Sequence, residues 1–235
     1  MLYESCRLLL ITGHYGCGKT NFSMNLALDL AEKGKRVTLV DLDVVNPYFR
    51  TSDYASLLQA RGVRLIAPQF AHSNLDVPSL PAEMYAALEP SWPADTVIFD
   101  VGGDDAGATA LGRFSSLIKE QLYQMVYVVN KNRPLTADPQ RAVALLREVE
   151  AAARLKATAI VNNTHLQGST TLQTVLDAFD YGVETAKEAG LPLAVVTVPW
   201  GLELPQEIAF RCKQSGVKVY PIRRYVLPPW ETAAF

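Results

Sequence analysis

The sequence predicts an α/β fold of three layers, in which a mainly parallel sheet of about seven strands lies between two layers of helices. Three observations support this prediction. Short apolar runs recur along the chain, segments with helical spacing lie between them, and a glycine-rich loop joins the first run to the first helical segment. Since parallel neighbours need a crossover that a helix supplies, this alternation favours a parallel sheet covered on both faces.

The predicted strands are short, and several are rich in valine and isoleucine, which is typical of strands buried on both faces. In chain order they are Leu8–Thr12, Arg36–Val40, Val63–Ala67, Thr96–Phe99, Met125–Val129, Thr158–Val161 and Ala194–Val198. Helical spacing is clearest in the segments Asn21–Lys33, Thr136–Leu155 and Ser169–Ala189. Gly34 and Gly190 stand where two of these helices are expected to end.

The chain of 235 residues is near the upper end of what one hydrophobic core serves, so we expect a single domain over residues 1–235. One stretch departs from the alternating pattern. Residues 68–93 contain five prolines, and we interpret them as an irregular excursion with one short helix near Ala82–Leu88. Such an excursion is suited to a lid or a partner surface.

Composition argues against several classes of protein. Twenty-two basic and 24 acidic residues give a net charge of −2, so no overall positive field attracts nucleic acid, and Arg223-Arg224 is too small a patch to change this. Three widely spaced cysteines indicate a reducing compartment. Neither a signal peptide nor a membrane-spanning stretch is evident, and prolines near the C-terminus exclude a long membrane-binding helix. We expect a cytoplasmic protein.

Residues 13–20 match the phosphate-binding pattern G-x-x-x-x-G-K-[ST], directly after a predicted strand and before a helix that begins near Asn21. The backbone N–H groups of such a loop point at phosphate oxygens, and the following helix adds the positive end of its dipole. The lysine reaches the β- and γ-phosphates, and the threonine hydroxyl binds Mg²⁺. The predicted nucleotide contacts are Gly13, His14, Tyr15, Gly16, Cys17, Gly18, Lys19, Thr20 and Asn21, with Lys19 also catalytic.

Carboxylates follow two predicted strands. Asp41 and Asp43 come after one, and in an extended chain they point to the same face, so that one orients a water while the other approaches the metal. Asp100 and Gly103 form a D-x-x-G word, in which the carboxylate serves the metal and the glycine N–H senses the γ-phosphate. We therefore predict Thr20, Asp43 and Asp100 at the metal. Asp104 and Asp105 are also interpretable as caps of a following helix.

Together these residues resemble the MinD/ParA-like branch of P-loop proteins, which also contains CobQ/CobB-type synthases. The resemblance lies in the P-loop followed, after one helix, by a strand ending in D-x-D. It implies a P-loop NTPase fold, Mg-dependent ATP hydrolysis and a homodimer closed over ATP. MinD/ParA members carry a signature lysine at the second loop position, where this chain has His14. His14 is either its replacement or a solvent-facing loop residue.

The resemblance also implies where the purine binds. An asparagine after a later strand and a loop after the next strand select the base in these relatives, and here they correspond to Asn163, with Asn162 as the fallback, and to Pro199 and Trp200. Trp200 is equally interpretable as a core residue. The nearest word to the guanine-reading N-K-x-D motif, at residues 130–133, lacks the aspartate, so ATP is favoured over GTP.

The leading functional hypothesis is an ATPase that acts as a dimer switch on a protein partner or cargo. The alternative is an ATP-dependent biosynthetic ligase or kinase that holds a small carboxylated substrate between Asp43, Asn46, Tyr48, Arg50 and the 68–93 excursion. The segment from Asn46 to Arg50 is also interpretable as a dimer surface. A protein that binds nucleotide without hydrolysing it is a third hypothesis. Stimulation of turnover by a metabolite would separate the first two.

Overall fold

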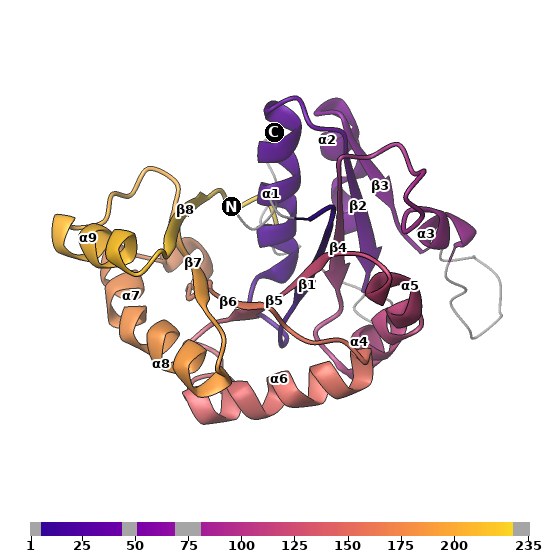
Figure 1. Cartoon of the computed structure of the whole chain (residues 1–235). Helices are drawn as coiled ribbons and strands as arrows, with labels where there is room; N and C mark the ends of the chain where they lie inside the picture. The colour runs from indigo at the N-terminus through magenta and orange to yellow at the C-terminus, as the bar shows by residue number, and fades with distance from the viewer. Residues whose placement is uncertain (1–5, 44–50, 69–80, 228–235) are drawn as a thin grey trace.

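The computed structural model describes residues 6–43, 51–68 and 81–227. Eight strands form one sheet in the order β3-β2-β4-β1-β5-β6-β7-β8, and neighbouring strands pair in parallel (Figure 1). The prediction of a mainly parallel α/β sheet is confirmed. The strands are β1 (Leu8–Thr12), β2 (Val37–Leu42), β3 (Val63–Ile66), β4 (Thr96–Val101), β5 (Tyr123–Val129), β6 (Ala159–Asn162), β7 (Leu193–Pro199) and β8 (Lys218–Ile222).

The eighth strand, β8, corrects the expected number of about seven. Its sequence, Lys-Val-Tyr-Pro-Ile, contains Pro221, which has no N–H to donate to a neighbouring strand. Proline is tolerated on an edge strand, where one row of backbone groups needs no partner. β8 pairs only with β7 in the sheet order, so Pro221 lies at such an edge.

Nine α-helices and two short 3₁₀ turns connect the strands in the described residues. The helices are α1 (Lys19–Glu32), α2 (Ala55–Ala60), α3 (Ala82–Ala86), α4 (Asp105–Gly112), α5 (Ser115–Lys119), α6 (Pro139–Ala153), α7 (Leu172–Asp177), α8 (Phe179–Ala189) and α9 (Gln206–Gln214), and the turns are η1 (Thr51–Tyr54) and η2 (Gln167–Ser169). The short helix expected near residues 82–88 is α3. Residues 69–80 of the proline-rich excursion lie outside the described residues.

Two predicted helices differ in their bounds. The helix expected over 136–155 begins at Pro139, because the Asp138 side chain caps it by accepting the Arg141 N–H and proline suits the first helical position. The helix expected over 169–189 is divided into α7 and α8. Thr171 caps α7 through a capping box with Thr174, and the two helices meet at Ala178.

The central strands are largely buried on both faces, whereas the edge strands β3 and β8 are partly exposed, and alternate residues of the central strands enter two separate cores. Leu8 and Leu10 of β1 belong to a core beneath α4, α6 and α8. Leu9 and Ile11 belong to the other core, which α1 covers. Figure 1 shows α1 and α2 on one side of the sheet and α4, α6 and α8 on the other. The three-layer prediction is therefore confirmed. None of the helices in the described residues is long and apolar enough to cross a membrane.

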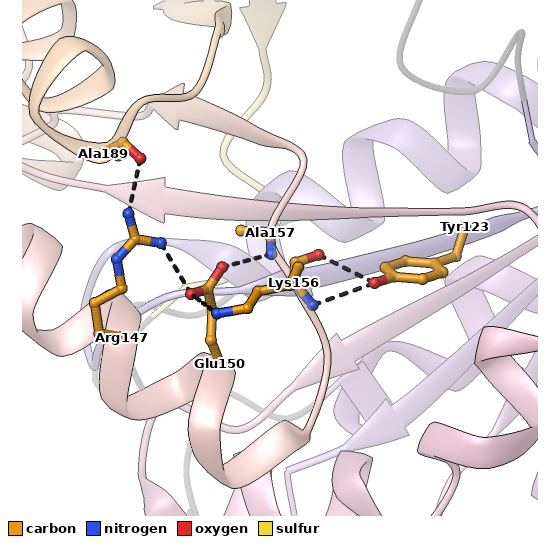
Figure 2. Close-up of polar contacts among 6 residues, drawn as sticks. All are labelled: Tyr123, Arg147, Glu150, Lys156, Ala157 and Ala189. Atoms are coloured by element: carbon orange, nitrogen blue, oxygen red, sulfur yellow. Dashed lines mark hydrogen bonds and ion pairs between the residues drawn. The ribbon is translucent and has the colours of Figure 1, made fainter.

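A buried carboxylate ties α6 to the chain that enters β6 (Figure 2). The Glu150 side chain is 2% exposed and accepts bonds from Arg147 Nη1 at 2.9 Å, Lys156 Nζ at 3.0 Å and the Ala157 N–H at 2.9 Å. Burial alone raises the pKa of a carboxyl, but these three donors outweigh it and hold the pKa of Glu150 below its ordinary value. The cluster holds the C-terminal part of α6 to the connector that leads into β6.

The sheet order places the glycine-rich loop at its centre. The chain passes from β1 to β2 and β3 on one side, returns through β4, and then continues to β5 on the other side of β1. Ligands of open parallel sheets bind beyond the carboxyl ends of the strands at such a reversal point. The loop after β1 therefore lies where this architecture places its ligands.

Candidate nucleotide-binding site

The glycine-rich loop, residues 13–18, joins β1 directly to the first turn of α1. Gly18 precedes the helix with φ of 80°, a left-handed conformation that glycine adopts without strain. Lys19 and Thr20 are the first two residues of the helix. The Lys19 side chain is 7% exposed, and its ammonium donates to the His14 carbonyl at 3.3 Å. The lysine thus folds back over the loop, as required to reach a phosphate held there.

Asn163 holds the loop from β6. Its Nδ2 donates to the Cys17 carbonyl at 2.7 Å, and its Oδ1 accepts the Thr197 hydroxyl at 2.6 Å. A Cβ on Gly18 would lie 2.5 Å from this Nδ2 and 2.8 Å from Nε2 of His165, so only glycine fits. Burial lowers the pKa of His165 to about 4, which keeps the ring neutral at pH 7. Asn163 lines the cavity described below, but its amide supports the loop.

Asp100 lies behind the first turn of α1. It is 2% exposed and accepts the hydroxyls of Ser23 at 3.1 Å and Thr51 at 3.0 Å. Burial raises the pKa of the Asp100 carboxyl, and the Lys19 charge and the hydroxyls of Thr20, Thr51 and Ser23 oppose that rise. The Thr20 hydroxyl and the Asp100 carboxyl are therefore close enough to interact, as two ligands of one metal ion must be.

The two aspartates of the D-x-D motif have different surroundings. β2 runs through Asp41, which is 1% exposed and opposite Asp100 in the strand register. The strand ends at Leu42, so the extended alternation does not continue, and the Asp43 N–H donates back to Asp41 Oδ1 at 2.9 Å. Asp43 lines the cavity, whereas Asp41 is not among its lining residues. Asp41 supports the turn that presents Asp43.

The segment after β4 packs on the loop. A Cβ on Gly103 would lie 2.7 Å from Lys19 Nζ and 2.8 Å from the Tyr15 nitrogen. The Tyr15 hydroxyl donates to Asp104 Oδ2 at 3.0 Å, and Asp104 Oδ1 accepts the Gly107 N–H at 2.8 Å. Burial, followed by the hydrogen bond to Asp104, raises the pKa of Tyr15 to about 12. Asp104 is thus the cap of α4, which agrees with its interpretation as a helix cap in the sequence.

A cavity of about 850 Å³ opens beside the loop. One end is lined by Lys19, Thr20 and Asp43, and the other by Thr197, Pro199 and Trp200. Neighbouring strands are ~4.8 Å apart, so the end of β7 lies roughly 14 Å along the sheet from the end of β1. Trp200 is 59% exposed, which excludes the interpretation as a core residue. The cavity has the volume and length for one extended nucleotide.

Two predicted contacts face elsewhere. The Cys17 side chain is fully buried, and its thiol lies 4.0 Å from the Thr136 hydroxyl. His14 lines a separate hollow of about 270 Å³ together with Tyr127 and Glu148. Burial lowers the pKa of His14, which favours the neutral ring. Both residues contribute backbone to the loop, and neither side chain lines the larger cavity.

The sequence analysis missed Arg133. Its Nε donates to the Gly16 carbonyl at 2.9 Å, and a Cβ on Gly16 would lie 2.7 Å from its Cζ, so the guanidinium packs against the loop. Arg133 also lines the cavity. It belongs to the Asn130–Arg133 word, in which Asn130 is fully buried and bonds the backbone of His165. This segment resembled a guanine-reading motif that lacks its aspartate, and nothing in its sequence indicated a contact with the loop.

The chain after β8 was missed as well. We call residues 223–227 the C-terminal strap; Arg223, Arg224, Tyr225 and Val226 all line the cavity. In sequence, Arg223-Arg224 was only a small basic patch. The substrate residues expected for a biosynthetic enzyme, Asn46, Tyr48 and Arg50, lie outside the described residues.

The loop, the buried carboxylate and the asparagine after β6 all fall within residues 9–166, which match a family model described as the CobQ/CobB/MinD/ParA nucleotide binding domain. The chain belongs to this family. Membership of the CobQ/CobB/MinD/ParA family confirms the resemblance read from the sequence. No curated protein matches the chain.

Solved structures share the fold of this CobQ/CobB/MinD/ParA domain at low identity. The 54 kDa signal recognition particle protein from Aeropyrum pernix, in complex with GDP, is 18% identical with a TM-score of 0.53, over 81% of this chain and 41% of that chain. FtsY from Thermotoga maritima is 20% identical with a TM-score of 0.55, over 83% and 62%. A nucleotide-binding protein from Archaeoglobus fulgidus, in complex with ADP, is 14% identical with a TM-score of 0.52, over 89% and 86%.

These likenesses concern the fold alone, because each identity is below 25%. The chain spans less than two thirds of the length of the signal recognition particle protein and of FtsY. It covers most of the Archaeoglobus protein. What the family shows for this chain is a nucleotide-binding P-loop domain.

Proposed function

We propose that this protein binds Mg-ATP in the cavity beside residues 13–20 and hydrolyses it, acting as a nucleotide-operated dimer switch on a partner or cargo. One observation carries the proposal: the ammonium of Lys19 lies over a loop that opens into a cavity of nucleotide size. The first turn of α1 supplies backbone N–H groups and a positive dipole end for the phosphates. The Lys19 ammonium then contacts the γ-phosphate and offsets the negative charge on it.

The residues around the loop fit a magnesium ion. Thr20, Asp43 and Asp100 offer hydroxyl and carboxylate oxygens, the ligands that Mg²⁺ prefers, and bound Mg²⁺ offsets the charge of the phosphates. Asp100 is already oriented by the Ser23 and Thr51 hydroxyls. Asp43 lines the cavity, where it orients the attacking water and accepts its proton. In this proposal Asp41 is a supporting residue.

The contact between Gly103 and the loop supports the switch. Gly103 lies so close to Lys19 and Tyr15 that a side chain there would collide with both. A phosphate that draws Lys19 forward changes what Gly103 packs against, and α4 begins two residues later at Asp105. Loss of the γ-phosphate on hydrolysis reverses that change.

The choice of ATP rests on the base end of the cavity. Asn130, which would read guanine in an N-K-x-D motif, is fully buried and bonds backbone instead. Solved neighbours were crystallised with GDP in one case and ADP in another, so both purines belong in the test.

The test is thermal unfolding with Mg²⁺ and ATP, ADP, GTP or no nucleotide, followed by phosphate release. A ligand at about a hundred times its Kd adds roughly 2.7 kcal/mol to the free energy of unfolding. We expect ATP to stabilise the wild type and Lys19→Ala to remove the effect. Stabilisation by GTP alone would reassign the base, and equal stabilisation of Lys19→Ala would remove the loop from the site.

The Asp43→Asn variant tests hydrolysis apart from binding. The amide keeps the shape of the carboxylate and still offers an oxygen to the metal, but it cannot accept a proton, so we expect Mg-ATP affinity to fall only several-fold and turnover to fall by at least ~100-fold. Single-turnover phosphate release at saturating ATP measures this. Turnover like that of the wild type would exclude Asp43 as the base.

A further inference from the structure

The C-terminal strap is attached to α1 by side chains rather than by the sheet. Asn25 accepts the Arg223 N–H at 2.8 Å through Oδ1 and donates to the Arg223 carbonyl at 2.8 Å through Nδ2. Asn21, one turn earlier, donates to the same carbonyl at 2.9 Å. Its Oδ1 accepts the N–H groups of Tyr225 at 2.8 Å and Val226 at 3.1 Å. Two asparagines thus take the place of a neighbouring strand.

This attachment adjoins the phosphate loop. Asn21 directly follows Thr20, and both residues line the cavity. At its far end the strap is held by the Leu227 N–H, which donates to the Tyr54 hydroxyl at 2.9 Å. Figure 1 shows the chain leaving β8 toward α1, so the strap crosses from the edge of the sheet to the helix that begins at the loop. The strap is therefore a wall of the cavity with a defined position.

The strap also sets the position of Arg223 against Trp200. The backbone N–H of Trp200 donates to the Ile222 carbonyl at 3.0 Å, so the backbone of Trp200 is anchored to the residue before the strap. The guanidinium carbon of Arg223 lies 3.8 Å from the centre of the indole ring, and both side chains line the cavity. The pair makes a flat cationic surface with N–H donors at its edge. A nucleobase matches it, since a base is planar and carries ring-nitrogen acceptors.

We propose that the C-terminal strap is part of the nucleotide site, that Arg223 on Trp200 binds the nucleobase, and that Asn25 positions Arg223. The inference rests on the proposed function, because it assigns the base end of the same cavity. It separates two duties. The loop binds the phosphates, and the strap binds the base.

Inorganic tripolyphosphate separates the two ends of the cavity, since it engages the loop and has no base. We expect Arg223→Ala to weaken Mg-ATP binding roughly tenfold, the size of one lost base-stacking contact, and to leave Mg-tripolyphosphate binding within about twofold. Arg223→Lys keeps the charge but not the plane, so its affinity for ATP should be intermediate. Isothermal titration of each variant with both ligands provides the measurement.

Asn25→Asp tests the positioning role with little change of shape. The carboxylate still accepts the Arg223 N–H, but it cannot donate to the Arg223 carbonyl and repels it. We expect a several-fold loss of ATP affinity with tripolyphosphate binding retained. Arg211→Ala is the matched control for Arg223→Ala. Arg211 also stacks on an aromatic ring, that of Phe179 at 4.6 Å, but it does not line the cavity.

Each outcome has a separate meaning. If the wild type binds ATP and Arg223→Ala binds it equally well, the strap assignment is wrong and the proposed function stands. If Arg223→Ala also loses tripolyphosphate while its unliganded melting temperature is unchanged, Arg223 serves the phosphates and its assignment to the base is wrong. If the wild type binds neither ligand, the proposed function fails and the strap proposal fails with it.

Discussion

At the scale of single residues, the phosphate loop is held by its carbonyl groups. The carbonyl of His14 accepts from Lys19, that of Gly16 accepts from Arg133, and that of Cys17 accepts from Asn163. Three carbonyl groups of the loop are therefore fixed by side chains, and the Cys17 N–H donates within the loop to the His14 carbonyl at 3.3 Å. The site is organised before a ligand arrives, which limits the entropic cost of binding.

The loop motif itself predicted which residues form the turn, because its spacing follows from backbone geometry alone. The supporting residues were beyond prediction. Arg133 lies 117 positions from Gly16 and Asn163 lies 146 from Cys17, and no local pattern encodes such contacts. Asn163 was predicted to face the base on resemblance, while its amide bonds the loop and Thr197.

Arg133→Ala tests this support. Loss of the bond to the Gly16 carbonyl frees that part of the loop, so we expect Mg-ATP and Mg-tripolyphosphate to bind five- to tenfold more weakly, about the net value of one typical hydrogen bond. Turnover at saturating ATP should change less than affinity. Arg141→Ala, at an exposed position on α6, is the control. Equal affinities in the two variants would contradict the role of Arg133.

At the scale of elements, apolar periodicity predicted those strands and helices whose formation depends on burying one side. Seven of the eight strands and α1, α6 and α3 were located because each buries a regular apolar pattern. The exceptions have local causes. β8 contains a proline that only an edge strand accepts, and the segment 169–189 is one amphipathic pattern that is interrupted where Thr171 and Ala178 start new helices. Both exceptions depend on where the segment lies in the folded molecule, and a local sequence pattern does not contain that information.

Glu150→Gln tests the cluster that fixes α6. The amide cannot accept two cationic donors as a carboxylate does, so we expect the free energy of unfolding to fall by about 1–3 kcal/mol at pH 7. The folded-state pKa of Glu150 is below the ordinary value of 4.5. The carboxylate therefore stabilises the fold above the unfolded-state pKa, and this stability is lost as pH falls through the folded-state pKa.

Urea unfolding from pH 7 to pH 3.5 measures the effect. The deficit of Glu150→Gln should shrink at the acid end, because there the unfolded wild type gains a proton that it must release to fold. Glu148→Gln, an exposed position on the same helix, should match the wild type throughout. A deficit that stays constant with pH would show that packing, rather than charge, causes it.

At the scale of the whole molecule, the order of the strands brings the site together. β4 lies between β2 and β1, so Asp43 after β2, Asp100 at the end of β4 and the loop after β1 share one edge of the sheet. The alternation of strands and helices predicted the parallel sheet but not the order of its strands. That order depends on pairing between segments that lie far apart in the sequence. The face with the loop also carries Tyr15, which is 37% exposed, and Asp104.

The proposed dimer switch predicts a change of mass. We expect sedimentation velocity to show a monomer without nucleotide or with ADP, and a dimer with Mg-ATP in the slowly hydrolysing Asp43→Asn variant. Lys19→Ala should stay monomeric in all conditions. A monomer in every state would remove the dimer from the proposal and leave ATP binding in place, whereas a dimer without nucleotide would make association independent of the switch.

The C-terminal strap gives the molecule a built-in reporter. The backbone amides of Tyr225 and Val226 both donate to one atom, Oδ1 of Asn21, which sits beside Thr20 in the first turn of α1. Their exchange with deuterated solvent therefore depends on a single side chain and not on a sheet ladder. A ligand that tightens that turn slows the exchange of these two amides, and one that strains the turn quickens it. These two amides thus report, through their exchange rates, on events at the phosphate loop some 200 residues earlier.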